Sequence, residues 1–132
     1  MRSVKRIAVL SLAAALLCGC QSNKAEDGVK NTYTQIDQAE AASMMERDDG
    51  HIIVDVRRQD EYDEGHIPGA VCIPNESIPP APELLCDKDR IILVYCRSGR
   101  RSKEAAQKLA DLGYSNVYEF GGIIDWKGPV TK

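Results

Sequence analysis

The stretch that decides the fold runs from residue 91 to residue 102 and reads IILVYCRSGRRS. Its first five residues, 91–95, are apolar or aromatic and predict a strand that is buried on both faces, as in parallel sheets. Cys96 ends this strand and opens a loop that contains a glycine and three arginines. From Ser102 onward, apolar residues at helical spacing predict a helix that stops at Gly113. The stretch therefore places one thiol between a buried strand and a helix N-terminus.

The surroundings of Cys96 favour the anionic form of its thiol. Loop amides, three guanidinium groups and the positive end of the helix dipole all stabilise negative charge. A thiolate is the nucleophilic form of cysteine, so we expect Cys96 to be the catalytic residue. An ordinary core cysteine is the alternative, and three arginines within five residues argue against it. The predicted binding loop consists of Arg97, Ser98, Gly99, Arg100, Arg101 and Ser102.

The length of the loop separates two kinds of cysteine chemistry. A cysteine phosphatase of the tyrosine-phosphatase type needs an arginine at the sixth position after its cysteine. Here that position is Ser102, and Arg101 stands at the fifth. A loop that is one residue shorter encloses less space than a tetrahedral phosphate needs. It suits a small anion attached to Cys96, such as the outer sulfur of a persulfide.

Three motifs, in order along the chain, resemble those of single-domain rhodanese-like sulfurtransferases. The central motif is the loop segment 94–102. The upstream motif comprises residues 53–57, 61–62, 65–70 and 73–74, and the downstream motif comprises 117–122 and Trp126. The resemblance covers residues 33–132. It implies a three-layer α/β fold with a mostly parallel central sheet. It also implies that Cys96 takes sulfane sulfur from a small anionic donor such as thiosulfate and passes it to a thiol or protein acceptor.

The resemblance also implies roles for single residues. Arg101, which closes the loop, is the arginine expected to face the donor. Asp55 and Arg57 end a predicted strand beside the site, where they either brace the loop or form an ordinary buried ion pair. No cofactor is implied, and no cysteine or histidine cluster has the spacing of a metal site. A module that senses sulfur species without turnover is the alternative function, although the intact loop argues against it.

The first 19 residues resemble a bacterial lipoprotein signal peptide. Arg2, Lys5 and Arg6 precede an apolar run, 7–17, that is too short to span a membrane comfortably. The run ends in Leu-Cys-Gly before Cys20, which we expect to receive lipid. Residues 20–32 then form a polar tether, and 33–132 form the domain. These features predict a lipid-anchored protein outside the cytoplasm, in the bacterial envelope. A plain secretory signal or an uncleaved anchor remains open.

Composition limits the partners of the mature protein. Cleavage before Cys20 removes three cations and changes the formal net charge from −3 to −6. This acidic balance argues against nucleic-acid binding, and we expect a monomer of one domain. In an oxidising compartment Cys72 and Cys86 could form a disulfide worth about 3 kcal/mol. Two separate thiols, or a thiol that resolves the Cys96 persulfide, are the alternatives.

The remaining pattern alternates strands and helices, which predicts a parallel sheet with helices on both faces. Ligands of such sheets bind at the carboxyl ends of the strands, where Cys96 lies. We expect His66 to be structural and Trp126 to anchor the core. The predicted strands are 33–36, 52–56, 71–73, 91–95 and 117–120, and the predicted helices are 37–46, 58–64, 83–86, 102–112 and a short one near Trp126.

Overall fold

The computed structural model describes residues 31–132. The predicted signal peptide, the predicted lipid site Cys20 and most of the predicted tether lie outside these residues. No helix in the described part of the chain is long and apolar enough to cross a membrane. The elements are β1 (Thr34–Gln35), α1 (Gln38–Met45), β2 (Ile52–Asp55), α2 (Gln59–Glu64), β3 (Val71–Cys72), η1 (Asn75–Ser77), β4 (Ile92–Cys96), α3 (Arg100–Asp111), β5 (Val117–Gly122) and η2 (Ile123–Asp125), where η marks a 3₁₀ helix.

The strands form one five-stranded sheet in the order β1-β5-β4-β2-β3, and every pair is parallel. β4 lies at the centre, as its unbroken apolar sequence predicted, and all five of its residues are buried. Because the strands are parallel, their carboxyl ends share one edge of the sheet. The predicted α/β class and parallel sheet are confirmed.

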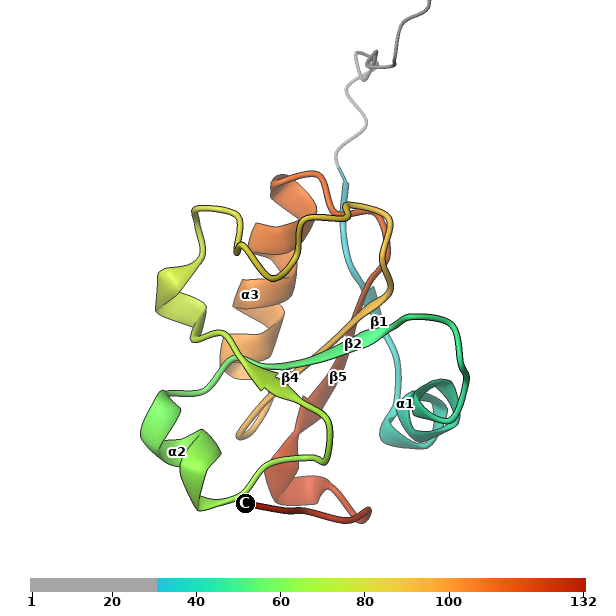
Figure 1. Cartoon of the computed structure of the whole chain (residues 1–132), viewed down its shortest axis with the longest axis vertical. Coiled ribbons are helices and arrows are strands. Elements are labelled where there is room, and N and C mark those ends of the chain that lie inside the picture. Colours follow the sequence, from blue (N-terminus) through green and yellow to red (C-terminus); the bar gives the residue numbers. More distant parts are fainter. Residues whose placement is uncertain (1–30) are drawn as a thin grey trace, which may run out of the picture.

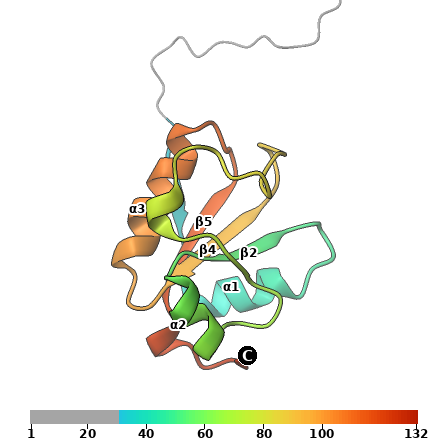
Figure 2. The ribbon, with the colours of Figure 1, turned by 60° about the vertical axis from the view of Figure 1, so that its left-hand side comes forward.

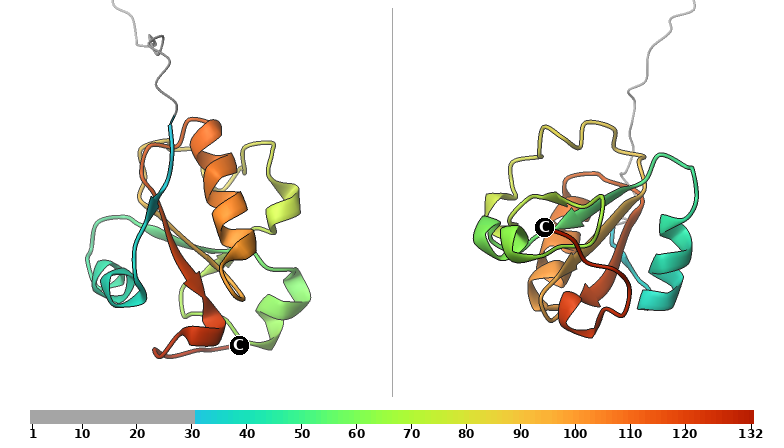
Figure 3. Two further views of the ribbon diagram at one scale, coloured as in Figure 1. Left: turned by 180° about the vertical axis from the view of Figure 1, so that it is seen from behind. Right: turned by 60° about the horizontal axis from the view of Figure 1, so that its bottom comes forward.

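Helices cover both faces of the sheet (Figure 1). On one face, Ala105 and Leu109 of α3 pack against Val94 of β4 in a cluster that excludes water completely from these three side chains. On the other face, Ala41 and Met44 of α1 belong to a second buried cluster. Figure 3 shows the two helices on opposite sides of the strands, from behind and from below. The result is the expected three-layer arrangement.

Local signals account for the ends of the two longer helices. Asp37 caps α1, where its carboxylate accepts a hydrogen bond from the Glu40 amide at 2.8 Å. Gly113 follows the end of α3 with a φ of 103°, a conformation that glycine adopts without strain. At its start, α3 begins at Arg100, two residues before the predicted position. The cause is Gly99, which takes the N-cap position with a φ of 108°.

The predicted helix 83–86 is wrong. The chain after Ile78 is irregular, and the predicted helix is replaced by a turn in which the Leu85 amide donates to the Pro82 carbonyl at 3.0 Å. Prolines at 79, 80 and 82 supply no amide hydrogens, and four further residues cannot offset the cost of starting a helix. The segment is held instead by Leu85, which is 1% exposed and whose carbonyl accepts a hydrogen bond from the Tyr114 hydroxyl.

The C-terminal segment also departs slightly from the prediction. The short helix expected near Trp126 is η2, which ends just before that residue. The Trp126 ring packs 5.8 Å from the Phe120 ring, between centroids, against the α1 side of the core. The predicted role of Trp126 as a core anchor is therefore confirmed. The backbone then pairs Thr131 with His66, which joins the end of the chain to the turn after α2.

Candidate active site

Cys96 lies at the carboxyl edge of the sheet, in the loop that joins β4 to α3. Figures 1 and 2 show that α2, this loop and the turn after β5 gather at the same end of the molecule. Backbone contacts hold them together: Cys96 pairs with Gly122 in the sheet, and the Ile124 amide donates to the Arg97 carbonyl at 3.2 Å. The strand ends thus fix the position of the loop.

The loop wraps closely around the thiol. The Gly99 amide donates to the Cys96 Sγ at 3.0 Å, and Cys96 is only 1% exposed. α3, twelve residues long, begins directly after Gly99 and presents its positive end here. Gly122 leaves room for the loop, because a Cβ at that position would lie 2.0 Å from the Arg97 carbonyl oxygen. Negative charge on Sγ is therefore stabilised by the fold itself.

Ser102 and Glu119 lie beneath the thiol, and both are fully buried. The Ser102 Oγ is 3.4 Å from the Cys96 Sγ and 2.5 Å from the Glu119 Oε2. The predicted loop included Ser102, but the sequence reasoning assigned no role to Glu119. Its one signal in the sequence is a carboxyl group within the otherwise apolar strand β5.

A polar hollow of about 480 Å³ opens beside the loop that follows Cys96, and we call it the mouth. It is large enough for a small anion and carries charges of both signs. The predicted loop residues supply one side, and α2 and η1 supply the other. The lining residues are Arg58, Glu61, Glu76, Arg97, Ser98, Arg100 and Arg101.

The three loop arginines differ in their partners. Arg101 donates to both carboxylate oxygens of Glu61, at 2.8 and 3.1 Å. These hydrogen bonds lower the pKa of Glu61 to about 2, so its charge balances that of Arg101 at neutral pH. Arg100 pairs with Glu104 at 3.1 Å. Within residues 31–132, no carboxylate pairs with Arg97, which is exposed at the mouth. Sequence reasoning missed Glu61 because its partner is 40 residues away.

Asp55 and Arg57 do not brace the loop, which corrects one of the two predicted roles. The Arg57 guanidinium donates to both Asp55 oxygens, at distances between 2.7 and 3.1 Å. Its Nη2 also donates to the Gly65 carbonyl at 2.7 Å. The two side chains are almost completely buried and form the ordinary ion pair that was the alternative. Their contacts hold the turn after α2 and do not reach the loop.

The predicted disulfide between Cys72 and Cys86 is absent, and both are free thiols. The Cys72 Sγ lies in the half-buried strand β3 and donates to the Arg57 carbonyl at 3.6 Å, whereas Cys86 is exposed in the irregular segment. Burial, and then the negative charge of Asp55, raise the pKa of the Cys72 thiol to about 11. Cys72 is therefore a weak nucleophile at neutral pH, and the alternative of two separate thiols describes the structure.

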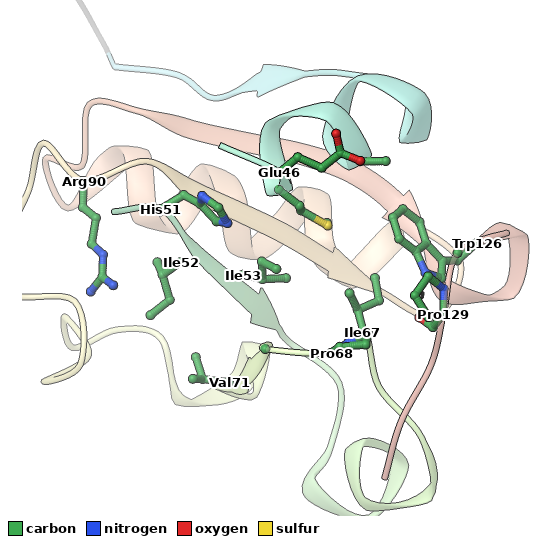
Figure 4. Close-up of a pocket in the computed structure, with 14 residues that line it drawn as sticks. Glu46, His51, Ile52, Ile53, Ile67, Pro68, Val71, Arg90, Trp126 and Pro129 are labelled. Atoms are coloured by element: carbon green, nitrogen blue, oxygen red, sulfur yellow. Dashed lines mark hydrogen bonds between the residues drawn. The ribbon is translucent and has the colours of Figure 1, made fainter. Parts of the chain in front are cut away.

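A second hollow, of about 590 Å³, has a different character (Figure 4). Apolar side chains such as Ile53 and Ile67 line it, together with Trp126 from the C-terminal segment. None of its lining residues belongs to the Cys96 loop. His66 lies outside it and is structural, as predicted, because its ring stacks on Tyr62 with centroids 3.7 Å apart. The chemistry of the molecule is thus concentrated at the mouth.

Comparison with known proteins agrees with this geometry. The model of the rhodanese-like domain matches residues 37–129. The chain is 38% identical over 96 residues to the thiosulfate sulfurtransferase GlpE of Coxiella burnetii, which covers 72% of this chain and 88% of the relative. It is 34% identical over 80 residues to the thiosulfate sulfurtransferase PspE of Escherichia coli, which covers 60% of this chain and 77% of the relative.

Solved structures show the same fold. A rhodanese with anions from E. coli superposes with a TM-score of 0.58 at 32% identity, covering 62% of this chain and 98% of the other. The rhodanese-like domain of the Alr3790 protein from Anabaena gives a TM-score of 0.67 at 30% identity, covering 74% and 77%. With the cysteine loop, the parallel sheet and these relatives in agreement, the chain belongs to the rhodanese-like family and is a sulfurtransferase of the rhodanese type.

Proposed function

We propose that Cys96 carries sulfur between a small anionic donor of the thiosulfate type and a thiophilic acceptor. The Cys96 thiolate attacks the outer sulfur of the donor. A bond forms between the Cys96 Sγ and that sulfur, while the sulfur–sulfur bond of thiosulfate breaks and its electron pair leaves with sulfite. The acceptor then attacks the outer sulfur of the persulfide, and the Cys96 Sγ leaves as a thiolate.

The observation that carries this proposal is that the Cys96 Sγ is held by a loop whose arginines line the mouth. The Gly99 amide, at 3.0 Å, and the start of α3 favour negative charge on Sγ before and after each transfer. No proton has to be removed from the nucleophile at the moment of attack. A hollow of about 480 Å³ also suits a donor of only a few atoms.

The arginine pairing suggests which residue meets the donor. The resemblance favours Arg101, but the charge of Arg101 is already balanced by Glu61. Arg97 lines the same mouth with an unpaired guanidinium, and such a group attracts an anion more strongly than a paired one. We therefore assign the sulfonate end of the donor to Arg97. Arg101, hydrogen-bonded to Glu61, forms part of the lining of the mouth.

The direct test is the intact mass of the protein before and after incubation with thiosulfate. Wild-type protein should gain one sulfur atom and should lose it again on addition of cyanide or a thiol. The Cys96→Ser variant should gain nothing. Cys86→Ser removes a thiol that is free and exposed, and it is the matched control that should behave like wild type. A sulfur atom that is still gained by Cys96→Ser would contradict the proposed route.

We further propose that the protein acts outside the cytoplasm, held to the bacterial envelope by lipid on Cys20. The support is the sequence of the first 20 residues: a basic start, an apolar run and a cysteine preceded by small residues. The acceptor would then be a thiol or a protein of the envelope. Metabolic labelling with a fatty acid should mark the wild-type protein and leave Cys20→Ala unmarked. Equal labelling of both would place the lipid elsewhere, and absence of label from both would contradict lipidation.

A further inference from the structure

The mechanism leaves unused a carboxyl group that is buried directly below the reactive thiol. Glu119 is 0% exposed and points to the α3 face of the sheet, next to Cys96. Between Glu119 and Gly122, β5 contains one more residue than the facing part of β4, which is a β-bulge. Bulges beside active sites often redirect a side chain. This bulge is closed by Glu119 itself, whose Oε2 accepts a hydrogen bond from the Gly121 amide at 2.9 Å.

Ser102 connects Glu119 to the thiol, and it has only one hydrogen to donate. Its Oγ lies 2.5 Å from the Glu119 Oε2, 3.0 Å from the Gly99 carbonyl and 3.4 Å from the Cys96 Sγ. If Glu119 is ionised, the hydroxyl hydrogen points to Glu119 and an oxygen lone pair faces the sulfur. That arrangement repels a thiolate. If Glu119 is protonated, it donates to Ser102 and frees the hydroxyl hydrogen. A thiolate, as a charged acceptor, then competes for this hydrogen with the neutral Gly99 carbonyl.

The environment of Glu119 offers its carboxyl group no positive charge. Its second oxygen, Oε1, is buried and has no hydrogen-bond partner among residues 31–132. No lysine, arginine or histidine in the described part of the chain forms an ion pair with it. An ionised carboxylate that is buried without a cation loses its hydration and gains no compensating charge. A thiolate 3.4 Å beyond Ser102 would add repulsion between two negative charges.

We propose that Glu119 is a positioning residue that works as a neutral acid. Its proton is donated to the Ser102 Oγ, and the Ser102 hydroxyl is thereby aimed at the Cys96 sulfur. The thiolate and the persulfide then receive two hydrogen bonds, one from the Gly99 amide and one from Ser102. This inference rests on the proposed function only in taking Cys96 as the nucleophile. An amide nitrogen can also donate to Ser102, but it cannot accept the hydrogen bond that Oε2 now accepts from the Gly121 amide.

Other charged groups near the site do not change their charge between pH 6 and pH 9. Arginines stay protonated in this range, and Glu61, with a pKa of about 2, stays ionised. No histidine lines the mouth. The charged groups around the loop are those that line the mouth, Arg58, Glu61, Glu76, Arg97, Arg100 and Arg101, together with Glu104, which pairs with Arg100.

The test measures how fast iodoacetamide alkylates Cys96 as a function of pH. Peptide mass spectrometry follows Cys96 separately from the other cysteines, and the full protein is used. We compare wild type with Glu119→Gln, Glu119→Met, Ser102→Ala and the double variant Glu119→Met/Ser102→Ala. No sulfur donor is needed. If thiosulfate fails to load Cys96 while the alkylation pattern holds, the proposed function fails and this inference stands.

We expect Glu119→Gln to reach half of its maximal rate at a pH no lower than that of wild type, because its amide nitrogen can donate to Ser102 but loses the hydrogen bond from Gly121. Ser102→Ala and Glu119→Met should each need a pH about one unit higher, because a hydrogen bond to the thiolate is lost. The double variant should be no worse than either single variant, since both remove the same hydrogen bond. A shift to lower pH in Glu119→Gln or Glu119→Met would overturn the proposal, because it would show that removing an ionised carboxylate relieves its repulsion of the thiolate.

Discussion

Replacing Glu61 by glutamine should destabilise the protein in a pH-dependent way. The glutamine keeps the shape of the side chain and an oxygen for the Arg58 amide, which now donates to Glu61 at 3.0 Å. It removes the negative charge that faces Arg101 at 2.8 Å. The hydrogen bonds from Arg101 hold the pKa of Glu61 at about 2 in the folded protein, against 4.5 in the absence of the fold.

The sign of the effect follows from these two pKa values. A carboxyl group whose pKa is lowered by folding stabilises the folded state above its unfolded pKa. This stabilisation is lost as the pH falls from about 4.5 toward about 2. The pair is 21% and 14% exposed and borders the open mouth, so screening reduces its contribution. We expect Glu61→Gln to lower the free energy of unfolding by about 1–2 kcal/mol at pH 7.

Urea unfolding at pH 7 and pH 3 measures this contribution. The difference between wild type and Glu61→Gln should fall to less than half at pH 3. Glu64→Gln is the matched control, because Glu64 belongs to the same helix but is exposed. It should change the free energy of unfolding by less than about 0.5 kcal/mol at either pH. An equal loss at both pH values for Glu61→Gln would refute the electrostatic explanation.

Three further predictions concern the thiols and the loop. At pH 8 without reductant, maleimide should label Cys86 rapidly and Cys72 slowly. The labelling rate of Cys72 should rise as the pH approaches its pKa of about 11. Resistance of both thiols to maleimide would indicate a disulfide between them. Gly122→Ala should lower the free energy of unfolding by about 1–3 kcal/mol, because its Cβ would displace the loop. The rate of thiosulfate loading should then fall about tenfold or more, while circular dichroism still reports a folded protein. Arg97→Ala should raise the KM for thiosulfate about tenfold with little change in kcat, whereas Arg100→Ala, already paired with Glu104, should raise it less; equal effects would contradict the assignment of the donor to Arg97.

The sequence predicted those features that depend on neighbouring residues. The run 91–95 is apolar throughout, so it could be placed in the centre of a parallel sheet. The Asp37 cap and the stop at Gly113 depend on side chains or backbone within a single turn. The predicted helix 83–86 is wrong because proline is favoured at the start of a helix, and this one signal suggested a helix. The neighbouring prolines and the length of only four residues outweigh that signal.

Features that depend on distant partners could not be predicted. Glu61 meets Arg101 across 40 residues, and Glu119 meets Ser102 across 17. Neither distance is visible before the sheet and helices are assembled, so both acidic residues remained unassigned. Asp55 and Arg57 are only two residues apart, yet the pattern fitted either of two roles. The choice between them depends on the Gly65 carbonyl, which only the folded turn brings within reach.

The uniform direction of the strands has a consequence for how the protein would sit in the envelope. The chain enters every strand at one edge of the sheet and leaves at the other, where Cys96 ends β4. β1, the first strand after the proposed tether, is therefore entered at the edge opposite the mouth (Figure 1). For a domain anchored as proposed through Cys20, the anchor would join the domain at the end opposite the thiol and would leave the mouth free to face the aqueous space. Water-soluble thiols and the exposed surfaces of other envelope proteins would then be the acceptors with the most direct access to the persulfide.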